Sequence, residues 1–186
     1  FEVKEFEFTT YDNLVRKGQI ISPETPTDKY IIYNIGNDLT FENQTMLKNA
    51  ANLAIKTNSN IVLSNYRVID HPGKASAKAF IKDNLTIMDD LIQKQHINPG
   101  NITFYGHSFG GAVAAVSASA ASKQGYDVKL VSDRSFTSTS SFFAYYRDML
   151  IIKGLFKKLF QSAAIEMDAE NAIKKMPPDN ILIIHV

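Results

Sequence analysis

Residues 106–111, Gly-His-Ser-Phe-Gly-Gly, have the types and spacing best suited to chemistry in this chain. Ser108 has a glycine two positions before it and another two positions after it, Gly106 and Gly110. This spacing is typical of a sharp strand-to-helix turn that exposes a strained serine as a nucleophile. The glycines are needed because the backbone on either side of the serine approaches too closely for side chains. We therefore predict that Ser108 is a catalytic nucleophile.

The residues around this motif predict the elements that would position it. An apolar, strand-like run at 101–105 precedes the motif, and an alanine-rich helical run follows it to about residue 123. The amino end of such a helix directs free N–H groups and the positive end of its dipole toward a developing oxyanion. A chance match of the glycine-serine-glycine pattern is not expected to fall between a strand and a helix. The context therefore favours a catalytic role for Ser108 over coincidence.

The rest of the chain alternates between strand-like and helix-like segments. The pattern predicts strands at 2–10, 14–21, 30–35, 60–66, 127–132 and 181–184, and helices at 43–56 and 75–95. The second helix is the clearest, because Ala77, Ile81, Leu85 and Met88 recur at helical spacing. Strands separated by helices predict an α/β fold, with a mostly parallel sheet covered by helices on both faces.

Composition narrows the class of protein. The 186 residues fit a single domain with a substantial core. A net charge of +1 argues against a nucleic-acid partner, and the lack of cysteine excludes disulfides, a thiol nucleophile and a cysteine-ligated zinc. Neither an apolar span of 18 residues nor a signal-peptide pattern is seen, which leaves a cytoplasmic or a secreted location open.

The motif and the alternating elements together resemble the α/β-hydrolase superfamily over nearly the whole chain, in particular serine esterases and lipases with short caps. Residues 33–37, Tyr-Asn-Ile-Gly-Asn, resemble the HGN loop after the third strand, and 65–67, Asn-Tyr-Arg, resemble the YRG that follows the fourth. Residues 133–138 resemble the segment after the sixth strand, and 181–186 resemble the seventh strand. The resemblance implies an oxyanion hole made by the backbone N–H groups of Phe109 and Asn37.

The same resemblance implies a catalytic triad in the order serine, acid, histidine, with the acid after the seventh strand and the histidine after the eighth. This sequence stops at the seventh strand. We therefore expect a C-terminally incomplete fold, a fragment of a longer hydrolase, with the acid and the base beyond Val186. An apolar sheet edge at this point would need cover, so the remainder of its own chain is an expected partner.

Two internal residues are alternative members of a triad. Asp133 follows the sixth predicted strand, a position that some members of the superfamily use for the acid, although a turn or helix cap before Arg134 is the other interpretation. His71 follows the fourth strand and would open on the same edge of the sheet as Ser108. The remaining histidines have structural explanations as strand or helix-end residues: His96, His107 and His185.

Residues 142–160 form the most apolar stretch, interrupted by four basic residues, Arg147, Lys153, Lys157 and Lys158. The stretch lies between the sixth and seventh predicted strands, where the resemblance implies a cap, so 142–176 is predicted to be a cap or helical insertion. An apolar cap favours an acyl or lipid-like substrate. A helix buried against the sheet and a basic amphipathic helix on a membrane surface are the alternatives.

The function expected from these features is serine hydrolysis of a carboxylic ester or acyl lipid, through an acyl-enzyme on Ser108 and without a metal or organic cofactor. A hydrolase-like module that has lost its base and only binds a ligand is one alternative. An acyltransferase on the same fold is the other. The excess of lysine over arginine, with abundant isoleucine and asparagine, is typical of bacterial proteins, including some effector hydrolases.

Overall fold

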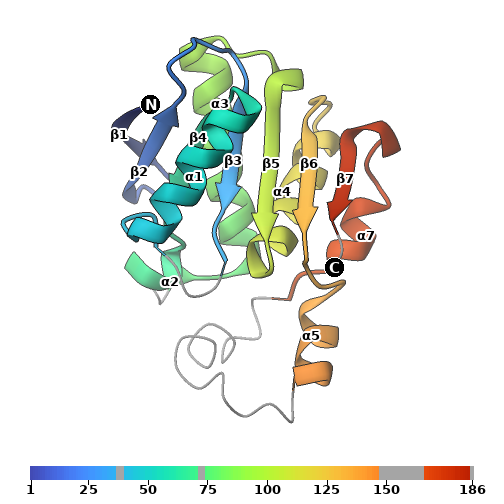
Figure 1. The fold of residues 1–186 in the computed structure, drawn as a ribbon. Coiled ribbons are helices and arrows are strands. Elements are labelled where there is room, and N and C mark those ends of the chain that lie inside the picture. Colours follow the sequence, from blue (N-terminus) through green and yellow to red (C-terminus); the bar gives the residue numbers. More distant parts are fainter. Residues whose placement is uncertain (37–39, 71–73, 147–165, 185–186) are drawn as a thin grey trace.

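The computed structural model describes residues 1–36, 40–70, 74–146 and 166–184, which form one sheet with helices on both of its faces (Figure 1). The strand order in this 7-stranded sheet is β1-β2-β4-β3-β5-β6-β7. β1 (Glu2–Thr9) and β2 (Val15–Ser22) form an antiparallel hairpin, and β2 also pairs antiparallel with β4 (Asn60–Ser64). The N-terminal strands are therefore the antiparallel part of a mixed sheet.

The remaining strands run parallel, so their carboxyl ends meet at one edge of the sheet. β3 (Tyr30–Asn34) lies between β4 and β5 (Ile102–His107), and β5 pairs with β6 (Lys129–Asp133). β7 (Ile181–Ile184) pairs with β6 and ends the sheet. The predicted mostly parallel α/β sheet is thereby confirmed. The carboxyl edge is where sheets of this kind place their ligands.

The helices divide between the two faces of the sheet. α1 (Gln44–Thr57) covers one face, over β2 and β4. α3 (Ala77–Gln95), α4 (Phe109–Lys123) and α7 (Ala169–Ile173) cover the other face (Figure 1). The short α2 (Arg67–Asp70) follows β4, and the 3₁₀ turns at Pro99–Asn101 and Pro178–Asn180 lead into β5 and β7.

Local side chains set the ends of the two long helices. The Asn43 side chain accepts hydrogen bonds from two backbone N–H groups at the start of α1, and the Ser76 hydroxyl accepts one from the N–H of Ala79 at the start of α3. Both helices end at a residue in the left-handed conformation, Asn58 with φ 45° and His96 with φ 57°. These caps explain why the predicted helices stop where they do.

The sheet separates two groups of buried side chains. One group lies between α1 and the sheet, and the other lies between the sheet and α3, α4 and α7. The alanines of α4 are almost all buried, which allows this helix to lie close against β5 and β6. Because α4 begins directly after Ser108, this close packing positions the serine relative to both strands.

α5 (Thr139–Tyr146) contains the start of the predicted 142–176 insertion and extends beyond the carboxyl edge of the sheet (Figure 1). Ser138 forms an isolated bridge with Asp168, and the N–H of Thr139 donates to the Met167 carbonyl at 3.0 Å. The chain therefore leaves the domain after Ser138 and returns to it before Asp168 at neighbouring positions. Residues 147–165, which hold most of the apolar stretch, lie outside the described residues. Within the described part of the chain, no helix has the length and apolar character to cross a membrane.

Candidate active site

Ser108 lies at the turn between β5 and α4, on the carboxyl edge of the sheet. Its backbone has φ 55° and ψ −120°, a conformation that a residue with a side chain rarely adopts. Serine is a preferred helix cap, yet the Ser108 hydroxyl forms no capping hydrogen bond with α4. The Ser108 hydroxyl therefore does not cap α4, and its role as a nucleophile stays a prediction.

Gly106 and Gly110 occupy positions where a side chain has no room. A Cβ on Gly106 would overlap the carbonyl of Gly110, far inside the 3.0 Å that real Cβ atoms keep. A Cβ on Gly110 would overlap the Asn34 carbonyl and would lie 2.8 Å from the Ile35 carbonyl oxygen. The turn therefore closes on itself and also presses against the end of β3. This close approach is the reason that both positions must be glycine.

The expected oxyanion donors come from two segments that meet at this turn. Phe109 begins α4, and its side chain is buried with 1% exposure. Asn37 lies outside the described residues, but Ile35 and Gly36 place the end of β3 beside the turn at 106–111, which we call the elbow. The structure thus brings the backbone of Asn34 and Ile35 next to that of Gly110, which follows Phe109. The assignment of both N–H groups stays a prediction.

Asp133 ends β6 and sits opposite His107 in the register of β5 and β6. Its carboxylate accepts hydrogen bonds from Arg134 at 2.8 and 3.1 Å and from the Tyr105 hydroxyl at 3.0 Å. The hydrogen bonds from Arg134 lower the pKa of Asp133 below its ordinary value. Among the described residues no histidine donates a hydrogen bond to this carboxylate, so its role as the triad acid stays a prediction.

The described histidines lie in two different places. His107 lines a surface cavity of about 490 Å³ beside Tyr105, Asp133 and Arg134, with α1 as its other wall. His96 ends α3, close to the turn that leads into the amino end of β5 and so opposite to Ser108. Among the described residues, no hydrogen bond joins a histidine to the Ser108 hydroxyl. His71 and His185 lie outside the described residues.

A cluster of charges, buried except for the partly exposed Asp12, contacts the segment that follows β4. The guanidinium of Arg67, which is 0% exposed, pairs with Asp83 of α3 and with Asp12 of the β1–β2 turn, in each case at 2.7 Å. Arg16 of β2 pairs with Asp83 at 2.8 Å. The hydrogen bond from Arg67 holds the pKa of Asp12 well below its usual value. Such a cluster is stable only when every charge has a partner.

Several residues that touch the elbow were not identified from the sequence as functional. The Ser135 hydroxyl donates to the Ser108 carbonyl at 2.8 Å, and Tyr66 packs against Phe109. Tyr66 and Arg67 belong to the segment that resembles YRG, which marked a place in the fold without showing what the side chains contact. In the described ranges, no three acidic or histidine side chains gather as a metal site would require.

Comparisons with known proteins agree with this architecture. A family model described as Chlamydia CHLPS protein (DUF818) matches residues 7–185. None of the curated proteins matches the chain. An alpha-beta hydrolase from Vibrio vulnificus has a TM-score of 0.70 and 21% identity, over 98% of this chain and 63% of that one.

Two esterases of known structure are also similar. The esterase from Pyrococcus furiosus has a TM-score of 0.65 and 18% identity, over 98% of this chain and 69% of its own. A hyperthermophilic esterase from the archaeon Pyrobaculum calidifontis has a TM-score of 0.59 and 20% identity, over 73% of this chain and 44% of its own. This chain thus spans less than two thirds of the length of some of its structural relatives. At these identities the likeness establishes the α/β-hydrolase fold.

Proposed function

The chain belongs to the family described as Chlamydia CHLPS protein (DUF818), and from this premise and its α/β-hydrolase fold we propose that it is a serine hydrolase acting on a carboxylic ester or acyl lipid. The observation that carries the proposal is the backbone of Ser108, with φ 55° and ψ −120° between a strand and a helix. A strained turn of this kind is characteristic of a nucleophile presented to substrate at the sheet edge.

In the proposed mechanism the Ser108 hydroxyl attacks the ester carbonyl, and a histidine base takes its proton. The carbonyl oxygen becomes an oxyanion that the N–H groups of Phe109 and Asn37 stabilise, each by about 2.7–4 kcal/mol. The protonated histidine gives its proton to the leaving oxygen as the bond between the carbonyl carbon and that oxygen breaks, so the alcohol departs and leaves an acyl-enzyme. The histidine, now neutral, takes a proton from the water that hydrolyses the acyl-enzyme, and returns it to Ser108. We propose that this histidine and its acid follow Val186, with Asp133 as the alternative acid.

Two observations support an ester with an apolar acyl part. Two proteins that share this fold carry the name esterase. The segment 142–160 is strongly apolar in composition, and its first residues belong to α5, which extends beyond the edge where Ser108 lies. A cap at that position would cover the acyl chain of the substrate, and it would also allow contact with a membrane surface.

Fluorophosphonate labelling of the longest natural chain tests the nucleophile, with mass spectrometry to locate the adduct. We expect an adduct on Ser108 that is lost in Ser108→Ala and kept in Ser122→Ala, a matched serine change in the last turns of α4. Hydrolysis of p-nitrophenyl esters should fall by about 10⁴-fold or more in Ser108→Ala only.

Other outcomes would replace the proposal with one of its alternatives. A folded natural chain in which Ser108 takes no label would favour the binding module. An acyl-enzyme on Ser108 that reacts faster with added alcohols or amines than with water would favour an acyltransferase. Ester hydrolysis that survives Ser108→Ala would place the reaction at another residue.

A further inference from the structure

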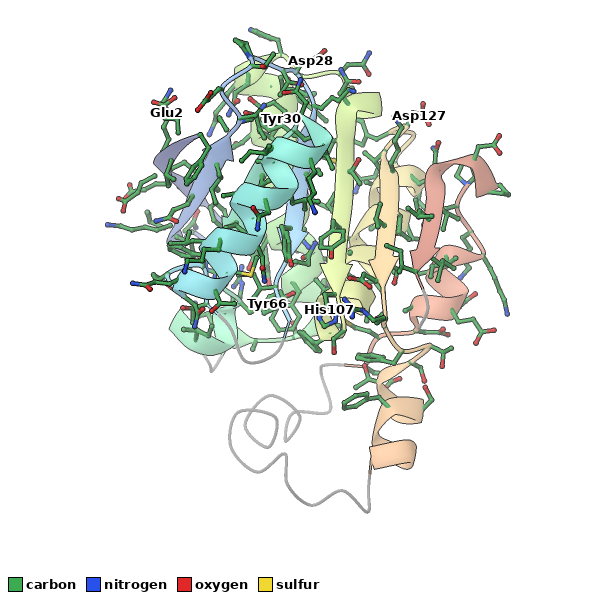
Figure 2. All side chains as sticks on the ribbon, in the orientation of Figure 1. Glu2, Asp28, Tyr30, Tyr66, His107 and Asp127 are labelled. Atoms are coloured by element: carbon green, nitrogen blue, oxygen red, sulfur yellow. The ribbon has the colours of Figure 1, made fainter. Side chains whose placement is uncertain are left out.

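Ser135 contacts the elbow from the segment that follows β6. Its hydroxyl donates a hydrogen bond to the carbonyl oxygen of Ser108 at 2.8 Å. The same oxygen accepts a hydrogen bond from the N–H of Gly111 at 3.0 Å, which is formed inside the first turn of α4. Figure 2 shows His107, the residue before Ser108, at the carboxyl edge of the sheet. Ser135 therefore joins the elbow to the neighbouring strand at the edge where sheets of this kind bind their ligands.

The contact with Ser108 fixes the direction of the Phe109 N–H. The Ser108 carbonyl and the Phe109 N–H belong to one planar peptide group, and this peptide bond is trans, so the two groups point in opposite directions. No freely rotating bond lies between them. A hydrogen bond that holds the carbonyl toward Ser135 therefore directs this N–H away from Ser135, toward the amino end of α4. Phe109 is one of the two expected oxyanion donors.

The glycine at position 111 makes room for this contact. A Cβ on Gly111 would lie 2.6 Å from the Ser135 Cβ and 2.9 Å from the Ser135 hydroxyl oxygen, closer than the 3.0 Å that real Cβ atoms keep. Gly110 and Gly111 are adjacent, and glycine has wide backbone freedom. The hydrogen bond from Gly111 thus restrains the Ser108 carbonyl only within this glycine turn. The Ser135 hydroxyl adds a restraint from outside the turn.

Neighbouring groups hold Ser135 in place. Arg134, just before it, has φ 48°, which is uncommon for a residue with a side chain. The N–H of Arg134 donates to the Ile184 carbonyl at 2.9 Å, and its guanidinium donates to the Asp133 carboxylate at 2.8 and 3.1 Å. The Asp133 carbonyl accepts the N–H of Ser108 at 2.9 Å. The segment after β6 therefore holds both peptide groups that flank Ser108, one by a backbone carbonyl and the other by the Ser135 hydroxyl.

We propose that Ser135 is a positioning residue that orients the Phe109 N–H toward the oxyanion by holding the Ser108 carbonyl. This inference rests on the proposed function, because it assigns no activity of its own. Formation and hydrolysis of an acyl-enzyme each pass through an oxyanion, so a misdirected donor slows both steps together. We therefore expect kcat to fall while KM changes little. A purely structural role would lower stability and leave kcat unchanged.

The test compares Ser135→Ala with Ser59→Ala in the longest natural chain. Ser135→Ala keeps the Cβ beside the elbow and removes only the hydroxyl. The Ser59 hydroxyl also donates to a backbone carbonyl, that of Thr57 at 3.2 Å. Ser59 precedes the residue that pairs with Tyr30, at the edge of the sheet opposite to His107 (Figure 2). Steady-state hydrolysis of a p-nitrophenyl ester and urea unfolding are measured for both variants.

We expect kcat to fall about 5- to 50-fold in Ser135→Ala, with KM within about twofold of the wild-type value, and no such loss in Ser59→Ala. The loss should stay below the roughly 10²–10³-fold of removing a donor outright, because the Phe109 N–H is still present. The inhibition constant of a trifluoromethyl ketone, which forms a tetrahedral oxyanion with the serine, should rise by the same factor as kcat/KM falls. Inhibition by the carboxylate product should not change, because the product carries no tetrahedral oxyanion.

Three kinetic results would overturn the inference. Unchanged kcat in a folded Ser135→Ala protein would leave only a structural role, while Ser108 labelling in the same sample would keep the proposed function intact. A fall in kcat without a matching rise in the ketone inhibition constant would show that the hydroxyl does not act through the oxyanion. An equal loss in Ser59→Ala would show a general effect of stability.

Two further measurements keep the test decisive. Hydrolysis that does not depend on Ser108 would overturn the proposed function and, with it, the inference. Should Ser135→Ala not fold, Ser135→Cys takes its place, because a thiol is only a weak hydrogen-bond donor. A wild-type ketone affinity in Ser135→Cys would then overturn the inference.

Discussion

At the scale of single residues, the strained backbone of Ser108 is held by hydrogen bonds at both of its peptide groups. Its N–H donates to the Asp133 carbonyl at 2.9 Å, and its carbonyl accepts from the N–H of Gly111 at 3.0 Å and from the Ser135 hydroxyl at 2.8 Å. A conformation of this kind costs on the order of 1–3 kcal/mol and persists only when the surroundings enforce it. The neighbours of Ser108 therefore maintain the turn.

The first prediction concerns Gly110. We expect Gly110→Ala to lower the free energy of unfolding by about 1–3 kcal/mol and to abolish labelling of Ser108, because the new methyl group would overlap the Asn34 carbonyl. Urea unfolding and fluorophosphonate labelling measure the two effects. Gly100→Ala is the control, since a Cβ there would come no closer than 3.4 Å to its neighbours. Equal stability of the two variants would contradict the steric argument.

At the scale of elements, a buried polar contact joins two helices to the end of β3. The Asn84 amide of α3 donates to the Asn34 side chain at 2.7 Å and to the Ser117 hydroxyl of α4 at 2.9 Å. Asn34 in turn donates to the Tyr105 carbonyl of β5 at 3.3 Å. Buried polar groups of this kind are stable when paired and costly when one partner is removed. The contact therefore holds together the elements that surround the elbow.

The second prediction follows from this contact. Asn84→Ala should destabilise the protein by about 2–3 kcal/mol, because it leaves the Asn34 and Ser117 oxygens buried without this donor. The exposed Gln93 of the same helix supplies the control, and Gln93→Ala should change stability by less than about 0.5 kcal/mol. Unfolding in urea measures both. A loss for Asn84→Ala as small as that of the control would mean that the contact is replaced by water.

The last strand leaves apolar side chains exposed. Leu182 is 55% exposed, Ile183 44% and Ile184 38%, and β7 is the end strand of the described sheet. Edge strands of this character are usually covered or blocked by charge. The sequence predicted an apolar edge here, together with its cover by further residues of the same chain. That cover, like the acid and base expected beyond Val186, stays a prediction.

At the scale of the whole molecule, the charges around Arg67 connect the N-terminal hairpin, α2 and α3. The third prediction concerns their response to acid. Because Arg67 lowers the folded-state pKa of Asp12 below its unfolded value, the stability from this pair is fully present above about pH 4. It is lost progressively as the pH falls from there toward the lower pKa of the folded state, because Asp12 takes up a proton first in the unfolded chain.

Urea unfolding of wild type and Asp12→Asn between about pH 3 and 6 measures this dependence. The difference in stability between the two proteins should be largest near pH 6 and should shrink as the pH falls below about 4. Asp90→Asn is the control, because Asp90 pairs with Lys94 at 2.7 Å on an exposed helix surface, where ion pairs contribute little. A constant difference across this pH range would show that Asp12 acts without its charge.

Much of the fold could be predicted from the sequence because its signals are local. The strands, the long helices and the turn at 106–111 follow from apolar spacing and glycine positions within a few residues of one another. His96 as a helix end follows in the same way. The pattern at 67–70 is too short to show periodicity, so α2 was not predicted.

The candidate site was predictable in part. Ser108 and its glycines form a contiguous motif, whereas the contacts of Asp133 with Tyr105 and Arg134 depend on which strands pair and which face each side chain takes. A capping role and an acid role for Asp133 were both compatible with its place after a strand. The cluster of Arg16, Arg67 and Asp83 gave no sequence signal, since these charges are separated by up to 67 positions.

The sequence by itself therefore determined the class of fold and the position of the strained serine, Ser108, since periodicity and steric demand act over a few neighbouring residues. Only the tertiary structure decided that Tyr66 reaches Ile35, 31 positions away, and that Asn84 joins α3 and α4 to β3. Such contacts arise from strand order and helix packing. The sequence pattern alone allows many different pairs of distant polar residues to form hydrogen bonds. The burial of each group then selects the partner that satisfies its hydrogen bonds.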